Sequence, residues 1–132
     1  MNILKKIALS TAIVAAFATV SAPAFAAEEH VDKNAVVKAA AADTIAKVNE
    51  AISIAEGNGD KAAFIAAIAD ARQAQKEFRY EQTERLRQKL NDKLRVAREA
   101  ADQGTMSEAG EAAKAAATIL TEMKGIYDAA HK

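Results

Sequence analysis

Two histidines and several carboxylates near the two ends of the chain are the residue types best suited to chemistry. His30 follows Glu28 and Glu29, while Asp128 and His131 lie three residues apart and so share one face of a helix. Imidazole nitrogens and carboxylate oxygens together suit a divalent copper, zinc or nickel ion. The sequence therefore predicts a metal site at His30, Asp128 and His131 if the two ends meet, and solvated terminal side chains if they do not.

Other reactive groups are scarce. The chain has no cysteine, which removes disulfides, thiolate metal sites and cysteine nucleophiles. The serines and threonines have no histidine or other base close to them in the sequence, and the Glu-x-x-His pairs of a diiron bundle are missing. We therefore expect a protein that is not an enzyme.

The first 26 residues have the pattern of an export signal. Residues 1–6 are cationic, residues 7–20 are uncharged and mostly apolar, and residues 24–26 fit the small-x-small pattern of a signal peptidase site. The apolar run is shorter than the about 20 residues of a membrane span, and we expect no span after it. We expect cleavage after Ala26 and a periplasmic or secreted domain over residues 27–132. Cleavage one residue later would place His30 third, the register of an amino-terminal copper or nickel site.

The mature sequence is typical of helices almost throughout. Alanine, the best helix former, supplies 27 of its 106 residues, and no proline follows Pro23. Asp60 is a predicted N-cap after the glycine turn at 57–59, and residues 105–108 form a predicted capping box after Gly104. Apolar residues at helical spacing predict the core: Val37, Ala41, Ile45, Val48, Ile52, Ala55, Phe64, Ile68, Ala71, Phe78, Leu86, Leu90, Leu94, Ala97, Ala101, Ala109, Ala112, Ala116, Ile119, Met123, Ile126 and Ala130.

The middle of the chain decides the architecture. Residues 60–103 contain no glycine or proline, so one helix of about 65 Å could run through them. However, the apolar stripe is rotated by about 80° between Phe78 and Leu86, which predicts a hinge at 79–83 with Thr83 as N-cap. A weak repeat at an offset of 42 residues agrees, since residues 47–50 recur as 89–92. We expect an all-α, up-down four-helix bundle made of two helical hairpins; the alternative is three helices with one long central helix that dimerises.

Charge is divided unevenly along the mature chain. Residues 27–71 carry a net charge of −4, residues 72–98 carry +5 and residues 99–132 carry −3. The basic middle segment could hold an anionic partner, such as lipid headgroups or a polyanion, or it could compensate the acidic segments on either side of it. We expect no nucleic-acid partner, because the protein is predicted to be exported.

Residues 49–77 (NEAISIAEGNGDKAAFIAAIADARQAQKE) and 91–120 (NDKLRVAREAADQGTMSEAGEAAKAAATIL) resemble the exported small metal-binding protein family. The resemblance implies two tandem helical hairpins and binding of divalent metals through surface histidines, which here are His30 and His131. The chain is also similar to the soluble periplasmic b-type cytochromes, which ligate haem through a methionine early in the first helix and a histidine late in the fourth. The first predicted helix has no methionine, so no haem is expected.

Taken together, the sequence predicts an exported, non-enzymatic helical-bundle binding protein with low-capacity divalent-metal binding. The alternative is a structural or interaction protein. Such a protein would self-associate through its apolar stripes, as a homodimer for example, or hold an anionic partner through its basic middle segment.

Overall fold

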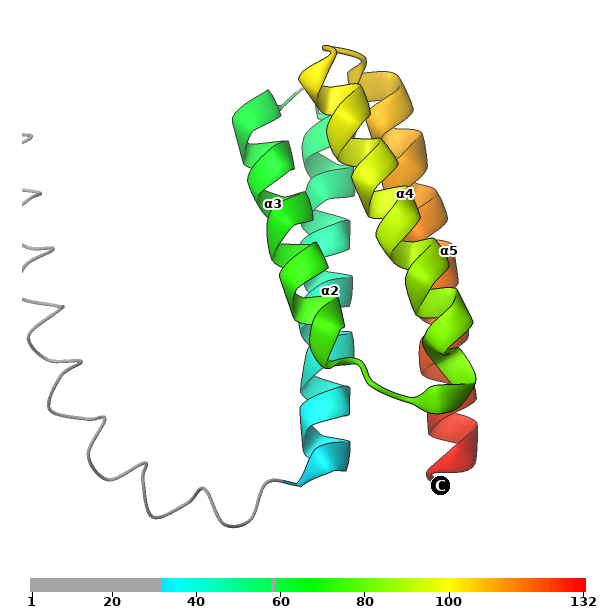
Figure 1. Ribbon diagram of the computed structural model, residues 1–132. Helices are drawn as coiled ribbons and strands as arrows, with labels where there is room; N and C mark the ends of the chain where they lie inside the picture. Colours follow the sequence, from blue (N-terminus) through cyan, green and yellow to red (C-terminus); the bar gives the residue numbers. More distant parts are fainter. Residues whose placement is uncertain (1–31, 58) are drawn as a thin grey trace, which may run out of the picture. The chain divides into compact units, whose positions relative to one another are not determined.

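Four antiparallel α-helices form the part of the chain that the computed structural model describes, residues 32–57 and 59–132. Figure 1 shows α2 rising to a turn, α3 descending, α4 rising again beside it and α5 descending to the C-terminus. The helices are α2 Lys33–Glu56, α3 Lys61–Ala74, α4 Glu84–Asp102 and α5 Met106–Ala130, with single 3₁₀ turns η2 Gln75–Glu77 and η3 Glu81–Thr83 between α3 and α4. The predicted all-α four-helix bundle is therefore confirmed.

Two hairpins make up the bundle. Helix α2 packs along α3 and α4 packs along α5, and the hairpins meet where α2 contacts α5 and α3 contacts α4. Within the described ranges, no helix combines the length and apolar character needed to cross a membrane. The predicted export signal over residues 1–26 lies outside those ranges, as do the N-terminus of the predicted mature domain and His30.

The turn between α2 and α3 follows its sequence signals. Asp60 is the N-cap of α3 and its carboxylate accepts a hydrogen bond from the backbone N–H of Ala62 at 3.2 Å. A side chain at position 59 would lie 2.8 Å from Cγ2 of Ile54 and 2.9 Å from its carbonyl oxygen, so only glycine fits there. The predicted N-cap at Asp60 is thus confirmed.

The turn between α4 and α5 corrects one prediction. Gly104 adopts the left-handed conformation, with φ of +84°, and terminates α4. The predicted capping box at residues 105–108 is wrong, because the Thr105 side chain makes no cap hydrogen bond to α5. Its hydroxyl instead donates to the carbonyl oxygen of Ala100 at 2.8 Å, and its backbone N–H donates to the same oxygen at 2.9 Å. Thr105 therefore closes the helix before it and leaves the start of the next one without a side-chain cap.

Residues 75–83, here called the link, join the two hairpins and confirm the predicted break. The irregular part is residues 78–80, since residues 81–83 form a 3₁₀ turn, so the break begins one residue before the predicted hinge. Tyr80 is extended, with φ of −147° and ψ of 121°. Thr83 is the N-cap residue of α4, but its hydroxyl donates to the carbonyl oxygen of Tyr80 instead of capping the helix. The chain leaves the helix where Phe78, 1 % exposed, enters the core.

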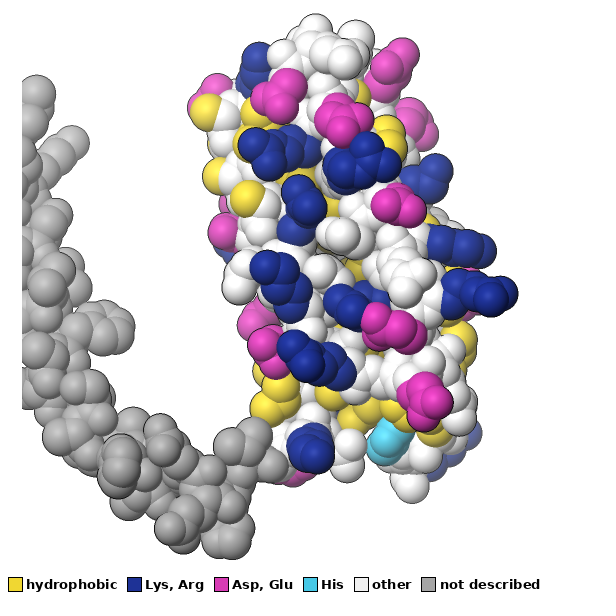
Figure 2. Space-filling model, viewed as in Figure 1, with side chains coloured by type: hydrophobic (Ala, Val, Ile, Leu, Met, Phe, Trp, Pro, Cys, Tyr) yellow, Lys and Arg dark blue, Asp and Glu magenta, His cyan; other side chains and the backbone are white. Residues whose placement is uncertain are grey.

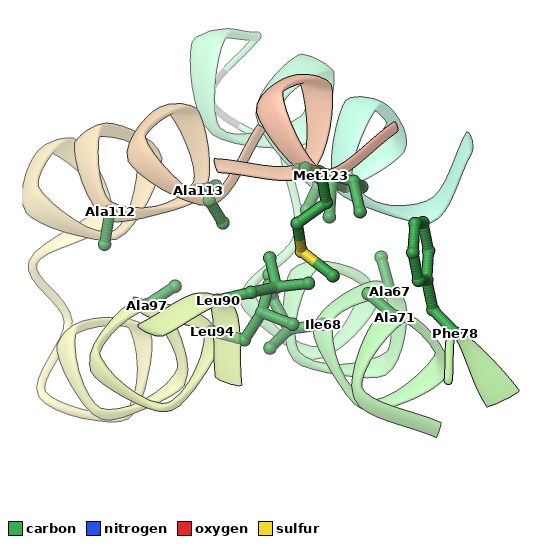
Figure 3. Close-up of a cluster of buried hydrophobic side chains, with 14 of the residues drawn as sticks. Ala67, Ile68, Ala71, Phe78, Leu90, Leu94, Ala97, Ala112, Ala113 and Met123 are labelled. Atoms are coloured by element: carbon green, nitrogen blue, oxygen red, sulfur yellow. The ribbon is translucent and has the colours of Figure 1, made fainter. Parts of the chain in front are cut away.

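The core is built from small residues around a few large ones. Figure 3 shows Leu90, Leu94, Ile68 and Met123 meeting between the helices. On α2 and α5 most predicted core positions are buried, among them Val48 and Met123, but some positions of each stripe differ. On α2, Thr44 is fully buried and donates its hydroxyl to the carbonyl oxygen of Ala40 at 2.6 Å, while Ile45 is only partly buried. On α5, the deeply buried side chains include Leu120 and Tyr127 rather than the expected Ile119, Ile126 and Ala130.

Candidate functional site

Asp128 and His131, two of the three predicted metal ligands, lie at the C-terminal end of α5. The Asp128 carboxylate is about half exposed and forms an ion pair with Lys124 one turn earlier. His131 is the C-cap of α5, and its Nδ1 lies 2.8 Å from the carbonyl oxygen of Tyr127. Across residues 32–57 and 59–132, no three or more His, Cys, Asp or Glu side chains are grouped so that they could hold a metal ion.

The ring of His131 belongs to an aromatic cluster, defined by Phe78, Tyr80, Tyr127 and His131. Its imidazole stacks on Tyr127 with ring centroids 4.0 Å apart and lies edge-on to Tyr80 at 5.2 Å. Tyr127 in turn makes edge contacts with Phe78 at 5.9 Å and Tyr80 at 5.3 Å. Its hydroxyl donates to Oδ1 of Asn34 at 2.7 Å. The cluster therefore ties the start of α2, the link and the end of α5 together at one end of the bundle.

A hollow of about 500 Å³, here called the link hollow, lies beside this cluster. It is lined by Lys76, Arg79, Tyr80, Glu81, Glu84 and Arg87. The irregular stretch 78–80 of the link places residues 76–81 next to the first turn of α4, which supplies the Glu84 and Arg87 side chains. Three cations and two carboxylates thus surround one depression beside a tyrosine ring.

Arg87 makes more hydrogen bonds than the other cations of the link hollow, all of them through its guanidinium. Its Nε donates to Glu84 Oε2 at 3.0 Å, its Nη2 donates to Oε1 of the same carboxylate, and its Nη1 donates to Oε1 of Gln75 at 3.1 Å. The hydrogen bond from Arg87 lowers the pKa of Glu84 from its ordinary value, and the reciprocal bond raises the pKa of Arg87. Gln75, only 3 % exposed, also donates to the carbonyl oxygen of Arg72, so the whole set is anchored to α3.

A second hollow, the α3–α4 hollow, adjoins the first through Lys76. It has a volume of about 310 Å³ and is lined by Ala69, Arg72, Gln73, Gln75, Lys76 and Asn91. The Nε of Arg72 donates to Oδ1 of Asn91 at 3.2 Å, and the Nζ of Lys76 donates to Oε1 of Gln73 at 3.2 Å. This lining holds two cations, three amides and no carboxylate, so its potential is positive.

The two hollows together carry an excess of positive charge. Among the described residues, Arg72, Lys76 and Arg79 form no ion pair with a carboxylate. Arg79 is near enough to Glu84 to help lower the pKa of that carboxyl, so the least compensated cations are Arg72 and Lys76. Figure 2 shows Lys and Arg side chains along the face formed by α3 and α4, with fewer acidic side chains between them. Sequence reasoning identified the basic segment 72–98 but not these particular side chains, since their convergence depends on where the link breaks the helix.

Comparison of the chain with protein-family models, with curated proteins and with solved structures finds no match.

Proposed function

We propose that this chain is an exported, non-enzymatic binding protein whose α3–α4 face holds the phosphate-type groups of an anionic partner. The observation that carries the proposal is the convergence of Arg72, Lys76 and Arg79 around two adjoining hollows, beside an Arg87 that is already paired with Glu84. Guanidinium groups present paired N–H donors that match the oxygens of phosphate groups, while lysine adds a mobile point charge. The proposal makes the basic middle segment a binding surface rather than a simple counter-charge to the acidic segments.

Two features of the hollows support this reading over a random surface charge. Arg72 is oriented by the hydrogen bond from its Nε to Oδ1 of Asn91, an uncharged partner, so it loses less conformational freedom when it meets a ligand and keeps its charge available. The lining of the α3–α4 hollow offers amide donors and no carboxylate, which removes the repulsion that an incoming anion would meet. A phosphate group can come from a soluble polyanion or from a lipid headgroup, and both present the same oxygens.

The test measures binding of the mature protein to two probes, soluble polyphosphate and vesicles that contain phosphatidylglycerol. Lys76→Gln with Arg79→Gln removes two cations from the hollows, and at about 1 kcal/mol per charge it should weaken binding about thirtyfold. The matched control, Lys89→Gln with Lys93→Gln, removes the same charge from exposed positions of α4 that line neither hollow. We expect the control to lose far less affinity.

The two probes also separate the two sources. Binding to polyphosphate without vesicle binding identifies a soluble polyanion, and the reverse identifies a membrane surface. Equal losses in both double variants would mean that only net charge matters, and the hollows would not be a site. Absence of binding to either probe would also overturn the proposal.

A second candidate, low-capacity divalent-metal binding at His30, Asp128 and His131, rests on the hydrogen bond of His131. Because a carbonyl oxygen can only accept, Nδ1 of His131 carries the proton, and the lone pair of the neutral ring is on Nε2. Metal-ligating histidines are typically oriented by such a bond from their other nitrogen. The resemblance of the sequence to exported small metal-binding proteins agrees with this candidate.

Copper(II), zinc(II) and nickel(II) titrations test it. A metal that binds only the folded chain raises the melting temperature. We expect this rise in the wild-type protein and its loss in the His30→Ala, His131→Ala double variant, with a partial loss in Asp128→Asn. A rise that persists in the double variant would assign the metal to other residues.

A further inference from the structure

The link is non-helical in a sequence that favours helix. Residues 60–103 contain neither glycine nor proline, and residues 75–77 and 81–83 already form helical turns on both sides of the break. For α3 and α4 to become one continuous helix, residues 78–80 must become helical, the two short 3₁₀ turns must relax to α-helix, and Thr83 must leave its present φ of −106° and ψ of 4°. Arg79 in the middle of this stretch is exposed and is a good helix former. Local preference thus opposes the observed conformation.

Tertiary contacts of the aromatic cluster are what hold the link in place. Phe78 is buried against Tyr127, and Tyr80 packs edge-on against both Tyr127 and His131. The backbone adds a hydrogen bond from the N–H of Arg79 to the carbonyl oxygen of Glu77 at 2.9 Å. The aromatic contacts join the link to the end of α5, and the first part of the link also packs against α2, so a small set of contacts at one end of the bundle holds the bent form.

The contacts between the two hairpins do not require that both hairpins belong to one chain. The α2–α3 hairpin meets the α4–α5 hairpin along α2–α5 and α3–α4, and each hairpin is closed by its own glycine turn. If the link straightens, the α4–α5 hairpin of one chain can pack on the α2–α3 hairpin of another and restore the same interface. A short connection under local strain is the usual condition for such an exchange.

We propose that two copies of this chain exchange their α4–α5 hairpins and form a dimer in which residues 61–102 of each copy are one continuous helix. The core of each half is the core of the monomer, assembled from two chains. The cost of leaving the bent form is the loss of the Phe78 and Tyr80 contacts, of the hydrogen bond between Arg87 and Gln75, and of the hydrogen bonds from Thr83 to Tyr80. The gain is the helical hydrogen bonding of residues 78–80, obtained once in each chain.

A disulfide between the two hairpins tests the exchange directly, because the natural chain has no cysteine. A Cβ at position 110 would lie 3.1 Å from Cβ of Ala55, a few tenths of an ångström less than the about 3.5–4.5 Å of a disulfide, so α2 and α5 must part slightly for the bond to form. Ala55→Cys with Gly110→Cys therefore joins α2 to α5. The purified double variant is refolded at high concentration, separated into monomer and dimer by size, diluted, and then oxidised. Each fraction is denatured and run on a non-reducing gel.

We expect the monomer fraction to give a single cross-linked chain and the dimer fraction to give two chains joined covalently. If the dimer fraction yields single cross-linked chains, the dimer consists of two associated bundles that have not exchanged hairpins, and the proposal is wrong. The proposal is also wrong if no dimer forms at any concentration. Failure of the monomer to cross-link would contradict the α2–α5 approach on which the exchanged interface is built.

A matched pair at Arg79 measures the role of the straight link without changing the hairpin interface. Arg79→Ala and Arg79→Gly remove the same exposed side chain, but alanine favours a helix and glycine disfavours it. Because the effect acts once in each chain, the dimerisation constant of the glycine variant should be about thirty times lower than that of the alanine variant. Equal constants would show that residue 79 is not helical in the dimer and would exclude the continuous helix.

Discussion

Gly110→Ala and Gly125→Ala place the same methyl group on the same helix in opposite surroundings. At position 125 the new Cβ has no atom within 4 Å, while at position 110 it lies 3.1 Å from Cβ of Ala55 on α2. Both substitutions gain helix propensity, about 1 kcal/mol each. Only the first must push two packed helices apart, since contacts of this kind are normally several tenths of an ångström longer.

The expected magnitudes follow from this contrast. Gly125→Ala should raise the free energy of unfolding by up to about 1 kcal/mol, which is about 4–8 °C in melting temperature for a domain of this size. Overpacking at position 110 costs about 1–3 kcal/mol, so the net effect of Gly110→Ala lies between no change and a loss of about 2 kcal/mol. The two variants should therefore differ by at least about 1 kcal/mol, measured by urea and thermal unfolding followed by circular dichroism.

An exchange of methyl groups serves as the control. Ala55→Gly with Gly110→Ala moves the methyl from α2 to α5 and removes the close contact. The double variant should be close to wild-type stability and more stable than the two single changes predict when added. If Gly110→Ala alone stabilises the protein as much as Gly125→Ala does, α2 and α5 are farther apart than described, and overpacking at position 110 is refuted.

Further predictions concern the turns, the link and the acid range. Gly104→Ala should lower the stability by about 1 kcal/mol, because position 104 has positive φ; an unchanged urea midpoint would contradict the left-handed cap. Two glycines inserted after Gln82 should leave a monomer in sedimentation and cost only about 0.6 kcal/mol in loop closure, and any larger loss of stability measures the hydrogen bonds from the buried Thr83 to Tyr80 that the insertion displaces. Glu84 has a lowered pKa when folded, so its pairing with Arg87 stabilises the protein above the ordinary value of 4.5 and this contribution is lost as pH falls below it. Glu84→Gln should therefore flatten the acid side of the stability profile, and an identical profile would rule that pairing out as a contribution.

Helix α4 and the α2–α3 turn were predictable because their signals are local. The stripe of Leu90 and Leu94 stands out against charged neighbours, and Asp60 caps its own helix two residues on. Helices α2 and α5 carry alanine on several faces, so spacing alone could not choose between Ala40 with Thr44 and the nearby Ile45. Packing of α2 against α3 and α5 determines which of these side chains is buried, because small side chains permit the close approach of α2 to α5.

From the sequence, the candidate site could be predicted only as a basic segment of the chain and not as a set of particular side chains. Net charge identified residues 72–98, but the grouping of Lys76, Arg79 and Arg87 depends on a break that no glycine or proline marks. The break is set by Phe78 entering a core contributed by Tyr127, which is far away in sequence. Likewise, Thr105 begins a capping-box sequence, but its hydroxyl donates to the carbonyl oxygen of Ala100 instead of capping α5. This competing hydrogen bond depends on the conformation of the turn, which the sequence pattern does not specify.

If two chains exchange hairpins as proposed, the link hollow depends on protein concentration. Lys76, Arg79, Tyr80 and Glu81 surround it only while residues 78–80 are bent, so a chain that straightens this segment also dismantles the depression. A molecule that binds the hollow therefore stabilises the bent chain by a free energy of RT ln(1 + [L]/Kd), where [L] is the concentration of the free molecule. This shifts the equilibrium from the exchanged dimer toward the monomer. Conversely, crowded chains would release such a molecule and dilution would favour its uptake. The fraction of link hollows that hold the ligand would then depend on the concentration of the protein as well as on the concentration of the ligand.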